Sequence, residues 1–255
     1  MILEKDKNRN KRGIKRAISI GWLLPNLMTV AALSFGLTGL RFAFAAKWTE
    51  MLFMLVLAIL FDTLDGRVAR LFRSTSQFGA QLDSLSDSIV FGVVPAISLY
   101  LWGLQPANKI AWTATLFFCV CSVLRLARFN SELQEETDKS KMFFTGIPMP
   151  AAGFLVLLPM VLYLEFGHEF LRDWRLIASW MILIGLGSIS IIPTFAGKTF
   201  ILPRRFAVPL LSSFAIIAAG VFIKPWMVWT ALSVFYILHI PIAALVYVKM
   251  KRKLT

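Results

Sequence analysis

Residues 49–72 read TEMLFMLVLAILFDTLDGRVARLF, a largely apolar stretch that carries two aspartates in its second half. The stretch is long enough to cross a hydrocarbon core of about 30 Å as a helix. A charged group inside such a span, here Asp62, is costly unless something compensates its charge, and it marks a functional site by default. We therefore interpret this segment as a membrane-spanning helix with a polar site built into it.

The rest of the chain shares this apolar character. Of the 255 residues, 58% are hydrophobic and 16% are charged, against roughly 25% charged residues in soluble domains. The apolar segments lack period-two alternation, which favours helices over a membrane β-barrel. We therefore predict an all-α polytopic bundle of eight spans, at about 20–45, 49–72, 80–103, 108–129, 147–165, 174–195, 206–222 and 226–248.

Basic residues indicate how these spans are oriented. Eight spans with a cytoplasmic N-terminus place 21 of the 27 Lys and Arg residues on the cytoplasmic side and six on the other side. An excess of basic residues in cytoplasmic loops is typical of membrane proteins. We therefore expect both termini in the cytoplasm, a basic arm over 1–17, a single transmembrane domain over 18–250 and a basic tail over 251–255.

The net charge of +13 does not indicate nucleic-acid binding, because the basic residues cluster at the ends of apolar spans. That placement favours contact with anionic membrane lipids.

Cys119 and Cys121 both lie inside an apolar run. We interpret them as buried structural residues rather than as a disulfide or a metal-binding pair.

Four aspartates are expected to converge between the second and third spans. Asp62 and Asp65 share one face of the second span, and Asp83 and Asp87 share one face of the third. A turn near Thr75 makes the two helices antiparallel, which brings all four carboxylates to similar depth. Converging carboxylates need cations, and oxygen ligands suit Mg²⁺ or Mn²⁺. We predict a divalent metal site with two ions, the usual device for phosphoryl displacement.

The spacing of these residues matches a known signature. The pattern DxxDGxxAR over 62–70, followed by GxxxDxxxD over 79–87, resembles that of the CDP-alcohol phosphotransferase family. The resemblance implies that Asp62, Asp65 and Asp83 bind metal. It further implies that Asp87 approaches the metals and acts as general base, and that the protein is a homodimer.

Small residues beside the carboxylates favour a ligand site over structural salt bridges, which are the alternative explanation of the aspartates. Gly66, Ala69 and Gly79 leave space that a bulky nucleotide diphosphate would require. The resemblance implies that these three residues make room for the CDP moiety. It also implies that Arg70 contacts the diphosphate, to which an arginine can bind bidentately.

Residues outside the signature bear on the substrates. Asn26 and Thr29, one turn apart in the first span, either bind the nucleotide or diphosphate or satisfy backbone groups freed by Pro25. The motif RLARFN over 125–130, with FTGIPMPAA over 144–152, resembles the bacterial membrane-spanning phosphatidylserine synthases of the same family. This narrower resemblance implies CDP-diacylglycerol as donor, L-serine as acceptor, and an inner-membrane enzyme with its active site facing the cytoplasm.

The acceptor-binding residues expected from the second motif are Arg125, Arg128 and Asn130. Simple anchoring of the two arginines at the membrane surface is the alternative. Other acceptors, such as glycerol phosphate, inositol phosphate or choline, remain open. So do a metal-dependent scaffold and an ion-coupled transporter with intramembrane acids, although a transporter predicts two repeated halves that this sequence does not show.

Overall fold

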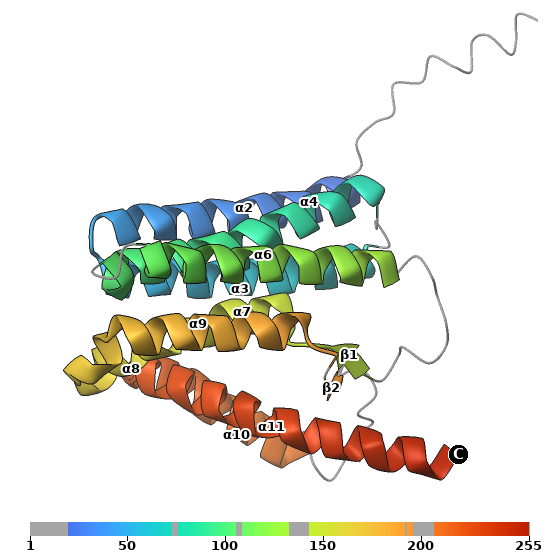
Figure 1. Cartoon of the computed structure of the whole chain (residues 1–255). Helices are drawn as coiled ribbons and strands as arrows, with labels where there is room; N and C mark the ends of the chain where they lie inside the picture. The colour runs from blue at the N-terminus through green and yellow to red at the C-terminus, as the bar shows by residue number, and fades with distance from the viewer. Residues whose placement is uncertain are drawn as a thin grey trace, which may run out of the picture.

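A computed structural model describes residues 20–72, 76–105, 109–132, 143–191, 193–195 and 207–254. Over these ranges the chain folds into helices that lie in successive layers (Figure 1). The expected basic arm over 1–17 lies outside the described residues.

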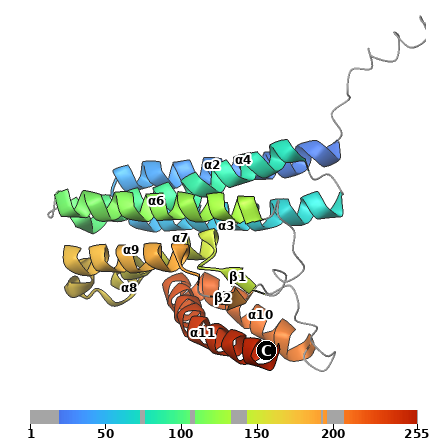
Figure 2. The ribbon, with the colours of Figure 1, turned by 45° about the vertical axis from the view of Figure 1, so that its right-hand side comes forward.

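The first half of the chain supplies the upper layers in Figures 1 and 2. α2 (Ile20–Phe44) and α3 (Trp48–Leu71) pack against each other along their length. The third predicted span is a run of consecutive helices, namely α4 (Gln77–Asp87), the π-helix η2 (Ser88–Val93), α5 (Val94–Leu99) and the π-helix η3 (Tyr100–Leu104). α6 (Lys109–Glu132) follows it and packs against η2 and α9.

The second half forms the lower layers, with α10 and α11 farthest from α2 (Figure 1). Its elements are β1 (Phe143–Thr145), α7 (Met149–Val156), α8 (Leu158–Phe166), the 3₁₀-helix η6 (Glu169–Arg172), α9 (Trp174–Ile189), β2 (Pro193–Phe195), α10 (Ala207–Ile223) and α11 (Pro225–Leu254). The two short strands pair antiparallel, with Phe143 opposite Phe195. The prediction of a helical fold is confirmed, and this strand pair is an addition that the sequence analysis did not include.

Seven of the eight predicted spans coincide with a helix or with a run of consecutive helices. The span predicted at 174–195 is too long, because α9 ends at Ile189 and residues 193–195 form β2. Among the described residues, five segments are long and apolar enough to cross a membrane: Leu23–Phe44, Gln77–Leu104, Lys109–Ser131, Met149–Phe166 and Pro225–Ala243. They fit a multi-pass membrane protein. The count of eight spans remains a prediction, because α3 carries several charged residues and because α9 and α10 have only 16 and 17 residues.

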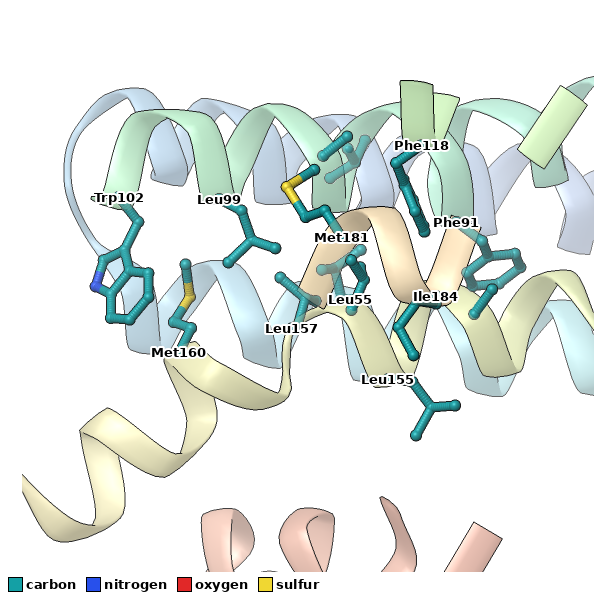
Figure 3. Close-up of a cluster of buried hydrophobic side chains, with 14 of the residues drawn as sticks. Leu55, Phe91, Leu99, Trp102, Phe118, Leu155, Leu157, Met160, Met181 and Ile184 are labelled. Carbon is teal, nitrogen blue, oxygen red and sulfur yellow. The ribbon is translucent and has the colours of Figure 1, made fainter. Parts of the chain in front are cut away.

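The core joins the two halves of the chain. Buried side chains from α3, α6, α7 and α9 meet in Figure 3, among them Leu55, Phe118, Leu155 and Met181. Many other apolar side chains point outward, as expected for helices that face lipid.

The π-helix η2 begins directly after Asp87, and it has a local cause. Pro95 has no N–H to donate to the carbonyl group of Phe91, so the regular helical ladder is interrupted there. Gly153 of α7 faces the same carbonyl, and a Cβ at Gly153 would lie 2.7 Å from the Phe91 oxygen. The irregular segment and the glycine thus allow α7 to pack closely beside the chain that carries Asp87.

Candidate metal and substrate site

Three of the four predicted aspartates form one cluster. Carboxylate oxygens of Asp62 in α3 and of Asp83 and Asp87 in α4 all lie within 4.8 Å of one another. The start of α4 is fixed by Ser76, whose Oγ accepts a 3.0 Å hydrogen bond from the Gly79 N–H. This cap determines which face of α4 the two aspartates occupy.

Asp65 lies beside this cluster and is held by α2. Its Oδ2 accepts a 2.6 Å hydrogen bond from Thr29 Oγ1, and both side chains are buried. The Thr29 hydroxyl also lies 3.1 Å from the carbonyl oxygen of Pro25. Asp65 still interacts electrostatically with the three clustered carboxylates. Thr29 was expected near the site, but its pairing with Asp65 was not predicted.

The cluster is chemically suited to a divalent metal. Oδ1 of Asp87 is buried and has no hydrogen-bond partner among the residues that the structure describes. A buried carboxylate oxygen without a donor is costly, and the side chains grouped with it are carboxylates as well. A cation would satisfy all of them, and hard divalent ions prefer such oxygen ligands. The residues present therefore fit a divalent metal.

The small residues of the signature have different surroundings. A Cβ at Gly66 would meet no atom within 4 Å, so there is open space beside the aspartates of α3. A Cβ at Gly79 would instead lie 3.0 Å from Oδ1 of Asn26, which is buried in α2. Gly79 therefore allows α2 and α4 to approach closely. The expectation that it leaves space for the nucleotide diphosphate is wrong, because Asn26 and Ser76 fill that space. Ala69 is half-buried and Arg70 is exposed in the last turn of α3.

The three expected acceptor residues have separate contacts. Arg125 is 6% exposed, and its guanidinium lies 5.8 Å from the centre of the Phe129 ring. Arg128 donates from Nη1 to the Ile189 carbonyl at 2.9 Å and from Nη2 to the next carbonyl group, that of Ser190, at 3.2 Å. Arg128 thus binds the C-terminal end of α9, where a cation is favourable.

Asn130 connects α6 to α4. Its Nδ2 donates a 3.0 Å hydrogen bond to Ser84 Oγ. Deeper in the bundle, a Cβ at Gly92 would lie 3.3 Å from Cβ of Ser122. Both pairs follow the same antiparallel register between α6 and the chain of α4 and η2.

This register places Arg125 opposite Ile89, about 3 Å along the helix axis from Asp87 at 1.5 Å per residue. Arg125 and Asp87 therefore lie at similar depth on facing helices. Ser233 and Tyr236 of α11 were not predicted from the sequence, and their hydroxyl groups are also buried in the protein interior. A polar pair three residues apart in an apolar helix was the signal that could have found them.

Comparisons with known proteins agree with this site. A model of the CDP-alcohol phosphatidyltransferase family matches residues 22–186, which include all four aspartates. The CDP-diacylglycerol–serine O-phosphatidyltransferase of Mycobacterium leprae is 35% identical over 231 residues, covering 90% of this chain and 76% of that protein.

Two further relatives carry the same name. That of Mycobacterium tuberculosis H37Rv is 33% identical over 239 residues, covering 93% of this chain and 82% of the relative. That of Methanocaldococcus jannaschii is 39% identical over 151 residues, covering 58% of this chain and 66% of the relative. The match to the family extends over most of the chain and includes its carboxylate cluster. The chain belongs to the CDP-alcohol phosphatidyltransferase family.

Proposed function

We propose that the protein transfers the phosphatidyl group of CDP-diacylglycerol to L-serine and releases phosphatidylserine and CMP. The observation that carries this proposal is the cluster of Asp62, Asp83 and Asp87 with its unpartnered buried oxygen. The family supports a CDP-activated donor and an alcohol acceptor. The names of the relatives favour serine over glycerol phosphate, inositol phosphate or choline.

Asp62, Asp65 and Asp83 would hold the metal, with Asp87 close to it. We favour two ions, Mg²⁺ or Mn²⁺, which when bound neutralise the diphosphate and the departing CMP. Thr29 orients Asp65 through its hydrogen bond. On the ligand side, Gly66 leaves space for CDP, and Arg70 reaches the diphosphate from the end of α3. Asn26 and Ala69 complete the wall around the nucleotide.

Asp87 serves as general base in this mechanism. Its carboxylate accepts the proton of the serine hydroxyl while the serine oxygen forms a bond to the phosphorus that carries the lipid. The bond from that phosphorus to the bridging oxygen of CMP breaks, and CMP leaves with the electron pair. Arg125 lies at the depth of Asp87 and binds the serine carboxylate, whereas Arg128 and Asn130 position α6 against α9 and α4.

The proposed membrane arrangement has eight spans within one domain over 18–250, with the arm over 1–17 and the tail over 251–255 in the cytoplasm. The distribution of basic residues, 21 on one side and six on the other, supports it. It places the active site at the cytoplasmic face of the inner membrane, next to anionic lipids. The family resemblance supports a homodimer.

Acceptor screening tests the proposed function. Purified protein is mixed with CDP-diacylglycerol, metal and one acceptor at a time, and CMP release is measured. We expect release with L-serine and not with glycerol phosphate, inositol phosphate or choline. Release with another acceptor but not with serine would overturn the assignment of serine. No release with any acceptor would favour a transporter or a scaffold.

Metal removal provides a second arm of the same experiment. Excess chelator should abolish serine-dependent CMP release, and added Mg²⁺ or Mn²⁺ should restore it, because the clustered carboxylates otherwise lack a counter-charge. Full activity in excess chelator would contradict the metal site.

A further inference from the structure

α11 lies outside the part of the chain that matches the family, which ends at residue 186. It is nevertheless fixed against α7. The Trp229 ring stacks on Phe154 with centres 4.2 Å apart and planes 2° apart, and Trp229 Nε1 donates to the Phe154 carbonyl at 3.2 Å. Figures 1 and 2 show α11 passing below the helices that contain the core. This contact determines which face of α11 is turned inward.

The inward face of α11 carries two hydroxyl groups. Ser233 is fully buried, and Tyr236 lies three residues further on, so both occupy one face of the helix. Neither hydroxyl has a hydrogen-bond partner among the residues that the structure describes. Buried polar side chains are nearly always hydrogen-bonded. Two such hydroxyls on one face are therefore available to bind a polar group.

Arg125 of α6 is a charged neighbour of Tyr236. Its side chain is buried, and its positive charge interacts electrostatically with the Tyr236 hydroxyl across the interior. A guanidinium presents only donors, and a phenol can donate to an anion. The group that suits both is a carboxylate, and hydrogen bonds to a charged group are the stronger ones.

We propose that α11 completes the acceptor site, with Tyr236 and Arg125 together binding the carboxylate of an amino-acid acceptor and Ser233 lining the same pocket. The proposal rests on the proposed function. It adds residues that determine acceptor specificity and that lie outside residues 22–186, the part matched by the family model. Since Arg125 lies at the depth of Asp87, a carboxylate held there leaves the acceptor's hydroxyl free to reach the general base. An acceptor without a carboxylate would leave the buried Tyr236 hydroxyl unsatisfied, which is an effective means of discrimination.

Tyr236→Phe tests this inference with minimal disturbance, because it removes the hydroxyl and keeps the ring. We expect the KM for L-serine to rise about 10- to 100-fold, as for a lost hydrogen bond to a charged group. The KM for CDP-diacylglycerol and kcat at saturating serine should stay within a few-fold. Tyr163→Phe is the matched control, because its hydroxyl donates to Glu169 at 3.2 Å, away from the acceptor pocket, and all three constants should be unchanged.

L-Serinamide provides an independent readout in the unmodified protein. It keeps the hydroxyl and the ammonium group but replaces the carboxylate with a neutral amide. We expect the KM for serinamide to exceed the KM for serine by about the same 10- to 100-fold. The preference for serine over serinamide should then be smaller in Tyr236→Phe. The reason is that the Tyr236 hydroxyl and the serine carboxylate contribute through the same hydrogen bond, so removing either one removes its effect. Ser233→Ala should reduce the preference less, since Ser233 only lines the pocket.

The outcomes separate two failures. If the unmodified protein releases no CMP with serine, the proposed function fails and this inference fails with it. If it uses serine but Tyr236→Phe keeps the serine KM and the preference over serinamide, only the inference about α11 is overturned. An equal rise in the KM values for serine and CDP-diacylglycerol would also overturn it, because that result indicates a general packing role. Should Tyr236→Phe fail to fold, equal use of serine and serinamide by the unmodified protein would still contradict the proposal.

Discussion

Thr29 in α2 donates a 2.6 Å hydrogen bond to Oδ2 of Asp65 in α3, and both side chains are buried. The contact joins the first span to the carboxylate site of the second. A carboxylate that is hydrogen-bonded in this way keeps one orientation, and partners of this kind tune the affinity of a metal site. Thr29 therefore acts on the site through Asp65.

Thr29→Val should weaken metal binding. The substitution keeps the shape of the side chain but removes the hydroxyl that orients Asp65. We expect the metal concentration for half-maximal CMP release to rise about 10- to 100-fold, and Thr29→Ser should stay close to the unmodified protein. Thr38→Val is the control, because the Thr38 hydroxyl bonds the Ser34 carbonyl within α2 at 2.7 Å. Equal metal dependence in Thr29→Val and Thr38→Val would contradict the role of Thr29.

Asp62→Asn and Asp87→Asn should differ in their effects. Asp62 is a predicted ligand, so its loss should reduce metal affinity and activity together. Asp87→Asn should keep part of the metal and CDP-diacylglycerol binding while kcat falls about 10²- to 10⁴-fold, the usual contribution of a general base. Titration of metal binding alongside single-turnover kinetics separates the two effects. An Asp87→Asn protein within a few-fold of normal kcat would remove Asp87 from the base role.

Arg125→Ala and Arg128→Ala should also have different effects, whereas the sequence alone treats the two arginines as equivalent. Arg125→Ala should raise the serine KM about 10- to 100-fold. Arg128→Ala should instead destabilise the protein by about 1.5–3 kcal/mol, because Arg128 binds two carbonyl groups at the end of α9. Thermal unfolding and steady-state kinetics on both variants test this. A large serine KM effect in Arg128→Ala with unchanged stability would reverse the assignment.

Gly66→Ala should separate stability from activity. A methyl group there meets no atom within 4 Å, and alanine is the better helix former, so stability should stay equal or rise by about 0.5–1 kcal/mol. The same methyl group would enter the space assigned to CDP, so the KM for CDP-diacylglycerol should increase. Gly153→Ala is the opposite case, because the new Cβ would lie 2.7 Å from the Phe91 oxygen. This substitution should therefore lower the melting temperature of the protein. An unchanged KM in Gly66→Ala would show that CDP does not occupy this space.

The sequence by itself determined the helices and the carboxylate cluster. Both depend on local spacing: apolar runs of spanning length predict helices, and the intervals within 62–70 and 79–87 place each pair of aspartates on one face. Because only a few residues separate the two segments, the two faces are expected to meet. Convergence of Asp62, Asp83 and Asp87 could therefore be predicted before the fold was seen.

Only the tertiary structure decided which distant residues meet these aspartates. Thr29 bonds Asp65, and Arg128 binds the end of α9. Tyr236 and Arg125 interact electrostatically although more than a hundred residues separate them in sequence. Helical periodicity shows which residues share a face, but it does not show which neighbour that face contacts. Those pairings depend on packing between helices, here through Gly79 against Asn26 and Trp229 against Phe154, and no local pattern in the sequence encodes them.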